Sequence, residues 1–247
     1  YIEPESLLAG NQASANRSAP VFPEYAMDWV IRELDEFDKR NGDVFYITEE
    51  TKQKLRDIYP FWEHNTLLDR GLAAMPPESR LFYDLGVIKA EGNLTSGDAH
   101  IAVDYERVLR EGLESYERRT RARMDALDLA KPENLKKLYF YESILITLRA
   151  MRTFAGRYAA LAEEEAKAAG PARAQELREM AEVLKKVPYH PAETFREAVQ
   201  SVWLVHLVLQ IESNGHSLSY GRMDQYLYPY YVRDLASGLI TGDAACE

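Results

Sequence analysis

One segment constrains the fold more than any other: residues 134–169 carry an apolar side chain at every third or fourth position. The positions of this stripe are Leu138, Tyr141, Leu145, Leu148, Met151, Phe154, Tyr158 and Leu161. The spacing predicts one long amphipathic helix, which Gly170-Pro171 ends. At 1.5 Å per residue such a helix measures roughly 54 Å. A helix of that length needs a large body to lie against, so the sequence predicts a helix-rich part of a large domain.

The composition excludes several classes of protein. The chain has 247 residues, 46% of them apolar, which suffices for one or two domains with a sizeable core. Its net charge of −10 argues against a nucleic-acid or anionic-membrane surface, which needs a concentrated basic face. With Cys246 as its one cysteine, neither an internal disulfide nor a cysteine-based metal cluster is expected. The sequence therefore favours a reducing, cytoplasmic setting, and its abrupt ends predict a piece of a longer protein.

Local patterns predict the remaining elements. Residues 6–23 start with a short apolar run and then become small and polar, which predicts a strand followed by an extended loop. Thr48, followed by two acidic residues, is a predicted N-cap. Residues 84–103 contain three glycines and lack helical periodicity, so a loop or a short strand is expected there. Helices resume from residue 104.

A polar loop follows the most apolar helix. From Val202 that helix is apolar nearly all round, which predicts that it is buried and that it delivers Asn214, His216 and Ser217 into the interior. Buried polar side chains must form hydrogen bonds with one another, with water or with a ligand. A histidine beside a serine suits a small hydroxylated ligand. The alternative is a capping loop whose polar groups satisfy the helix ends.

A second candidate is the glycine-rich stretch "GNLTSGDAH", which ends at His100. Its glycines allow the backbone to approach a ligand or another segment closely, but the Lys-Ser/Thr ending of a phosphate loop is missing. A glycine-rich turn with a chance histidine is the alternative. His206 lies in an apolar run and is predicted to be a core histidine. No two histidines have the i, i+4 spacing of a helical zinc site, so no metal is expected.

Three stretches resemble one family: "YIEPESLLAGNQASANRSAPVFPEY", "GDAHIAVDYERVLREGL" and above all "IESNGHSLSYGRMDQYLYPYY". They are similar to the pyruvate formate-lyase-like domain of glycyl-radical enzymes, over about residues 1–240, and most similar to the cobalamin-independent glycerol and propane-1,2-diol dehydratases. The resemblance implies an α/β fold in which residues 1–247 belong to a single domain. They would form the mainly helical N-terminal portion of a ten-stranded β/α barrel, without the cysteine loop and the C-terminal glycyl-radical domain.

The resemblance also implies roles for individual residues. His100 would be catalytic, as the general acid for the departing hydroxyl, and His216 and Ser217 would bind the substrate, with Asn93 a weaker candidate. The reaction would eliminate water from a small vicinal diol to give an aldehyde. A radical-SAM activase would install the glycyl radical outside this chain, with no other cofactor bound and no metal. A homodimer is implied, and association with a bacterial microcompartment is left open.

Two alternatives stay open. A sister activity would be a C–N or C–S lyase of the choline or isethionate type. Residues 87–100 offer Lys89, Glu91 and Asp98 but no arginine, which disfavours an anionic substrate without excluding it. The other alternative is a truncated scaffold without catalytic function. In either case residues 1–247 alone are expected to be inactive.

Overall fold

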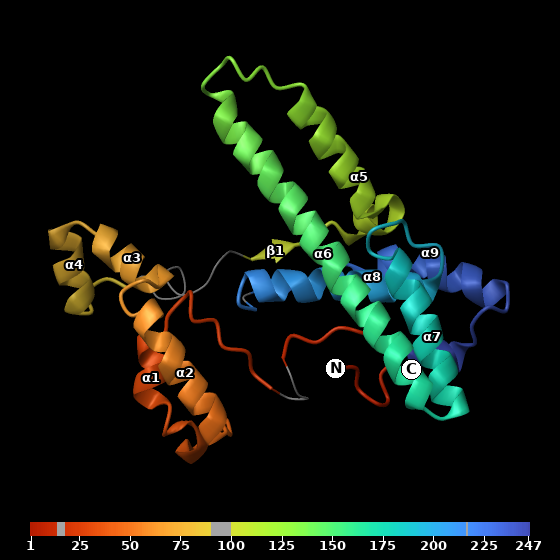
Figure 1. Ribbon diagram of the computed structural model, residues 1–247, viewed down its shortest axis with the longest axis horizontal. Helices are drawn as coiled ribbons and strands as arrows, with labels where there is room; N and C mark the ends of the chain where they lie inside the picture. Colours follow the sequence, from red (N-terminus) through yellow and green to blue (C-terminus); the bar gives the residue numbers. More distant parts are fainter. Residues whose placement is uncertain (14–17, 90–99, 216) are drawn as a thin grey trace. The chain divides into compact units, whose positions relative to one another are not determined.

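Helices dominate the computed structural model, which describes residues 1–13, 18–89, 100–215 and 217–247 (Figure 1). The elements in chain order are α1 (Asp28–Glu33), the 3₁₀-helix η1 (Phe37–Lys39), α2 (Glu49–Trp62), α3 (Leu67–Ala74), α4 (Pro77–Asp84), β1 (Ile101–Ala102), α5 (Tyr105–Asp125), α6 (Asn134–Ala168), α7 (Pro171–Lys186), α8 (Phe195–Glu212), β2 (Leu218–Ser219), α9 (Met223–Ala236) and α10 (Gly242–Cys246). Contacts divide the chain into two units. The first contains Tyr1–Ser18, His100–Ile211 and Ser217–Glu247, and the second contains Ala19–Ala99 and Glu212–His216.

The long helix predicted from the apolar stripe is confirmed as α6, and α7 lies beside its C-terminal half, with α5 beside its N-terminal half (Figure 1). Leu145, Leu148 and Met151 are buried, as the stripe predicts. Toward its C-terminal end, the buried face of α6 consists of small side chains, and so does part of the facing side of α7. These residues are Ala155, Ala159, Ala162, Ala166, Ala174 and Ala181. Because alanine side chains are short, the two helices can approach each other closely.

Helix α5 is interrupted at Gly112, which has φ 66° and ψ 165°. The interruption frees backbone groups that a continuous helix would use internally. Three hydrogen bonds join α5 to the segment 188–192: Leu113 N donates to Pro188 O (3.0 Å), Glu114 N to Tyr189 O (2.9 Å), and Ala192 N to Leu109 O (2.9 Å). The connection between α7 and α8 is therefore bound, through these hydrogen bonds, to the break in α5.

The strand predicted within residues 6–23 is wrong for the described part of that segment, which is irregular. Its backbone groups bond to side chains of helices instead of to a neighbouring strand. The Gln200 side chain accepts from Ala9 N (2.8 Å) and donates to Ala9 O (2.9 Å), and Trp203 Nε1 donates to Gly10 O (3.1 Å). A side-chain amide carries the same donor and acceptor as a peptide group, so Gln200 takes the place of a strand partner.

Helix α8 crosses the first unit and is buried along most of its length, as predicted. Val202, Leu204, Val205 and Leu207 are each at most 5% exposed. Leu204 packs in a cluster with α6 and α7, and Val202 and Val205 pack in a second cluster with α5, α6 and α9. The residue that interrupts this apolar run, His206, is 6% exposed and is a core histidine, as predicted.

The second unit has a small core of its own, formed by α1, η1 and α2. Its buried members are Met27, Val30, Leu34, Phe37 and Leu55. The predicted cap of α2 is confirmed, since the Thr48 side chain accepts a hydrogen bond from Thr51 N.

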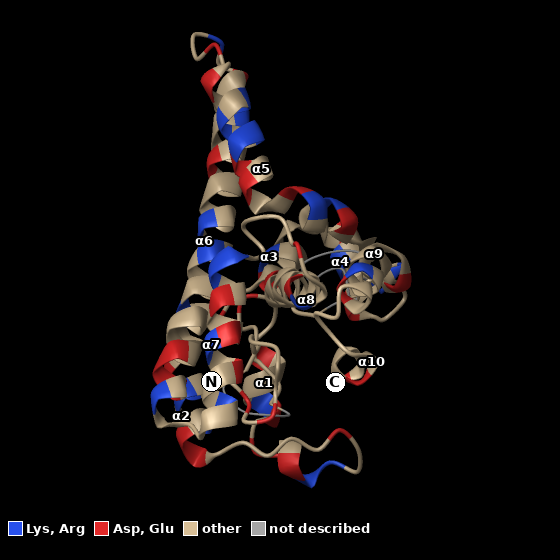
Figure 2. Ribbon diagram, turned by 90° about the vertical axis from the view of Figure 1, so that its right-hand side faces the viewer, with Lys and Arg blue, Asp and Glu red and all other residues tan. Residues whose placement is uncertain are grey.

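Basic and acidic residues both occur along α5 and α6, as the blue and red ribbon segments of Figure 2 show. Some form ion pairs one turn apart, such as Arg121 with Glu117 at 2.6 Å. This pattern is typical of a solvated helix surface. Within the described ranges, none of the helices combines the length and the apolar character that crossing a bilayer requires.

Candidate functional site

Two short parallel strands bring two of the predicted site residues together. β1 pairs with β2, with Ile101 opposite Leu218 and Ala102 opposite Ser219. His100 directly precedes β1 and Ser217 directly precedes β2, so this register puts both at the same end of neighbouring strands. Neighbouring strands lie about 4.8 Å apart. The register thus puts the backbones of His100 and Ser217 about one strand spacing apart.

The other two predicted residues, Asn93 and His216, lie outside the described residues. His100 and Ser217 are both exposed in this chain, while Ser213 at the start of the polar loop is buried. Of the residues predicted to point into the interior, Asn214 is partly buried and Ser217 is exposed within this chain, so the prediction is wrong for Ser217. The reason is size, because a pair of two-residue strands cannot enclose its own ends.

The backbone around Ser217 is strained. Ser217 has φ 52° and Asn214 has φ 50°, both in the left-handed region that glycine occupies more easily. A serine in this conformation costs free energy that a glycine would avoid, on the order of 1 kcal/mol. Retaining a hydroxyl there is consistent with a role for the Ser217 side chain, since strained residues cluster at functional sites.

An aromatic cluster stands at the opposite ends of the two strands. It consists of Tyr105, which begins α5 shortly after β1, Tyr220, which directly follows β2, His206 of α8 and Tyr226 of α9. The rings of His206 and Tyr220 are stacked with centroids 3.9 Å apart, and His206 Nδ1 lies 2.8 Å from the Tyr105 hydroxyl oxygen. Tyr226 donates its hydroxyl hydrogen to the carbonyl oxygen of Tyr220 (2.9 Å).

Burial fixes the protonation of this cluster. It lowers the pKa of His206 and raises that of Tyr105, and it raises the pKa of Tyr226 to about 12. All three groups are therefore neutral near pH 7. With its stacked rings and the contact between His206 and Tyr105, the aromatic cluster is suited to holding the strands in place. The sequence reasoning did not single out Tyr105 or Tyr220, although the signal was present: a tyrosine follows each of the two segments that carry site residues.

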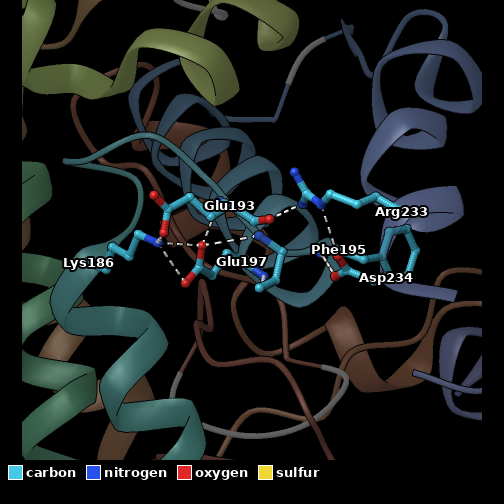
Figure 3. A network of polar contacts seen from close by, with 7 residues as sticks. Lys186, Glu193, Phe195, Glu197, Arg233 and Asp234 are labelled. Carbon is cyan, nitrogen blue, oxygen red and sulfur yellow. Dashed lines mark hydrogen bonds and ion pairs between the residues drawn. The ribbon is translucent and has the colours of Figure 1, made fainter. Parts of the chain in front are cut away.

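The helix that supplies His206 is fixed at its N-terminus by a polar network (Figure 3). Asp234 of α9 is 2% exposed and accepts from Phe195 N at 2.6 Å. Glu197 accepts from Glu193 N at 2.7 Å and from Lys186 Nζ at 2.8 Å. These acceptors satisfy backbone N–H groups at the start of α8, which have no partner within the helix.

A groove of about 620 Å³ lies between α5 and α9, apart from this site. Charged and aromatic side chains line it, among them Glu106, Arg110, Arg222, Tyr230 and Arg233. Neither His100 nor Ser217 contributes to it. Among the residues the structure describes, no group of three His, Cys, Asp or Glu side chains could hold a metal ion.

Comparison with known proteins gives one family. The family model described as pyruvate formate lyase-like matches residues 1–247. A probable dehydratase, YbiW of Escherichia coli K12, is 42% identical over 236 residues, which are 95% of this chain and 29% of that protein. The (2S)-3-sulfopropanediol dehydratase of Klebsiella oxytoca is 34% identical over 253 residues, covering all of this chain and 31% of that protein.

Similar solved structures include two that concern the dehydration of small diols. One that concerns 1,2-propanediol dehydration in Roseburia inulinivorans superposes with a TM-score of 0.93 at 39% identity, covering 99% of this chain and 29% of that one. The glycerol-bound form of the B12-independent glycerol dehydratase from Clostridium butyricum gives a TM-score of 0.92 at 36% identity, covering 99% and 31%. These matches confirm the predicted fold class. They also show that the chain spans about 30% of the length of the proteins it matches.

Proposed function

This chain belongs to the pyruvate formate lyase-like family, and on that basis we propose that it supplies part of the substrate site of a glycyl-radical dehydratase. The substrate would be a small vicinal diol such as propane-1,2-diol or glycerol. The elimination breaks one C–O bond, releases water and leaves an aldehyde. The full-length protein would be a carbon–oxygen lyase, with residues 1–247 alone inactive.

The observation that carries the proposal is the pairing of β1 with β2, which puts His100 and Ser217 at the same end of adjacent strands. A small diol offers two hydroxyl groups on neighbouring carbons. A hydroxyl and an imidazole about one strand spacing apart match that pattern of donors and acceptors. The likeness to structures concerned with 1,2-propanediol and glycerol dehydration supports the same substrate class.

In this proposal His100 acts as the general acid. A departing hydroxide is a poor leaving group, so the C–O bond breaks more easily if a proton reaches the oxygen in the transition state. An imidazole is the side chain best suited to give that proton near neutral pH, with a typical contribution of about 10²–10⁴-fold. Ser217 and His216 would hold the hydroxyls, and Asn93 would assist.

The glycyl radical, which a radical-SAM activating enzyme would install outside residues 1–247, supplies the hydrogen-atom abstraction that starts the reaction. We further propose a cytoplasmic homodimer, with a microcompartment as a possible setting to test. The residues of this chain would bind and orient the diol and deliver the proton. A closed polar site would also keep the radical from other hydrogen donors.

The test uses the full-length protein, activated anaerobically. His100→Ala should lose at least about 100-fold in aldehyde formation from propane-1,2-diol and glycerol, while electron paramagnetic resonance finds an unchanged glycyl-radical content. Tyr189→Phe, which removes a hydroxyl of the connection between α7 and α8 that donates to Glu117 of α5, is the matched control and should behave as wild type. Normal turnover in His100→Ala would remove this residue from the chemistry.

A second candidate is a sulfonated substrate, because the Klebsiella oxytoca relative is a sulfopropanediol dehydratase. Lys89 is exposed and precedes the segment that ends at His100, and it is the cation that this candidate would use for the sulfonate. Assaying propane-1,2-diol, glycerol, choline, isethionate and 3-sulfopropanediol side by side separates the candidates. A preference for the sulfonate that Lys89→Gln abolishes would favour the second one.

A further inference from the structure

The strand pair that aligns His100 with Ser217 is too short to fix its own register. β1 and β2 have two residues each and are joined as a two-stranded sheet. Short strands with few ladder bonds are prone to slippage, and a slip of one residue would turn each side chain to the other face. Contacts outside the strands must therefore set the alignment.

His206 makes contacts with both strand exits. Through Nδ1 it lies 2.8 Å from the hydroxyl oxygen of Tyr105, on the β1 side. Through its ring face it stacks on Tyr220, on the β2 side, with an interplanar angle of 20°. The rings of the two tyrosines are themselves 6.1 Å apart at 26°. One side chain of α8 thus connects the segments that follow the two strands.

The orientation of the His206 ring is fixed from the other side as well. Gln210, one turn further along α8, places its amide nitrogen 2.9 Å from His206 Nε2. With that amide as donor, Nε2 accepts and Nδ1 carries the hydrogen that it donates to the Tyr105 oxygen. Both ring nitrogens are therefore engaged, and the ring cannot turn without losing both hydrogen bonds.

We infer that His206 is a positioning residue, which holds β1 and β2 in register and so sets the separation of His100 from Ser217. This inference rests on the proposed function, because that function assigns those two residues to the substrate. It differs from an ordinary packing role, which would change stability but leave the geometry of substrate binding unaltered.

The experiment measures KM and kcat for propane-1,2-diol in the activated full-length protein. Three variants are compared: His206→Phe, which keeps the ring stack and loses the hydrogen bonds, Tyr105→Phe, which loses the partner hydroxyl, and the double variant. Tyr105→Phe should raise KM about tenfold, the effect of one lost hydrogen bond, and His206→Phe, which loses two, should raise KM at least as much, both with unchanged radical content. The double variant should be no worse than the more affected single variant, since both remove the same contact.

The matched control is Tyr189→Phe, which removes the hydrogen bond from Tyr189 to Glu117 (3.0 Å), away from both strands. Wild-type KM in His206→Phe and Tyr105→Phe, losses no larger than in the control, or additive losses in the double variant would each overturn the inference. If His206→Phe yields no folded protein, Tyr105→Phe decides by the same criterion. A wild-type protein that carries the radical but turns over neither diol would refute the proposed function instead.

Discussion

Replacing Gly112 by alanine should destabilise the protein more than its single added methyl group suggests. The residue has φ 66° and ψ 165°, a conformation that is essentially limited to glycine. A Cβ atom there would lie 2.5 Å from Tyr189 O, 2.7 Å from His190 C and 2.8 Å from Pro191 N. These are backbone atoms, so the clash is relieved only if the whole connection between α7 and α8 moves.

The magnitude follows from two unfavourable contributions and one favourable one. The unfavourable backbone conformation costs about 1–3 kcal/mol. Moving the connection weakens the three hydrogen bonds that seat it on α5, at about 1 kcal/mol each. Alanine restricts the unfolded chain and so returns about 0.5–1 kcal/mol. The expected loss in the free energy of unfolding is therefore about 3–5 kcal/mol, which lowers Tm by roughly 6–20 °C.

The assay is urea unfolding followed by circular dichroism at the helix band. Gly156→Ala is the matched control, since Gly156 lies inside α6 and a Cβ there meets nothing within 4 Å. That variant should gain about 0.5–1 kcal/mol because alanine has the higher helix propensity. If the two variants differ by less than about 1 kcal/mol, the reasoning about the break in α5 is refuted.

Three further changes test other parts of the structure. Gln200→Leu should lower the free energy of unfolding, measured in urea, by about 2–3 kcal/mol, because it leaves the buried N–H and C=O of Ala9 without a partner. A loss smaller than that caused by replacing an exposed glutamine with leucine would contradict this. Asp234→Asn should cost about 1–2 kcal/mol, since it weakens the charged acceptor for Phe195 N, and hydrogen exchange should then speed up at the start of α8. Burial lowers the pKa of His206 below its ordinary value of 6.5, so the unfolded state binds a proton that the folded state does not. The free energy of unfolding should thus fall as the pH drops below about 6.5, by at most about 1.4 kcal/mol per pH unit, and His206→Phe should lose this component in titrations between about pH 5 and 8.

Local periodicity predicted the parts of the fold that depend on it. The stripe along residues 134–169 gave α6 within one residue at its C-terminal end, and Thr48 was correctly identified as a cap. The apolar run around His206 predicted a buried histidine. Each of these features is decided by neighbours within a few positions of the chain, which the sequence displays directly.

The features that sequence reasoning missed depend on contacts between distant residues. The segment around Ala9 has the composition of a strand, but Gln200 satisfies its backbone and keeps it irregular. The break at Gly112 arises because another segment occupies the space of a side chain. Likewise, local patterns made His100 and Ser217 separate candidates, and only the family resemblance joined them in one site, because no local pattern reveals that four helices later the chain returns to pair β2 with β1.

The anchoring of Ala9 by Gln200 has a consequence for synthesis of the protein. The two residues are 191 positions apart in the chain. At about 5–20 residues per second, roughly 10–40 s pass between the emergence of Ala9 from the ribosome and that of Gln200. During this interval α6 and α7 can already cover Ile2 and Ala9, but the backbone N–H and C=O of Ala9 still lack the side chain that pairs with them in the folded protein. The nascent chain depends on α8 to complete its core. The segment around Ala9, although it is synthesised before α8, is therefore among the last parts to become protected from solvent.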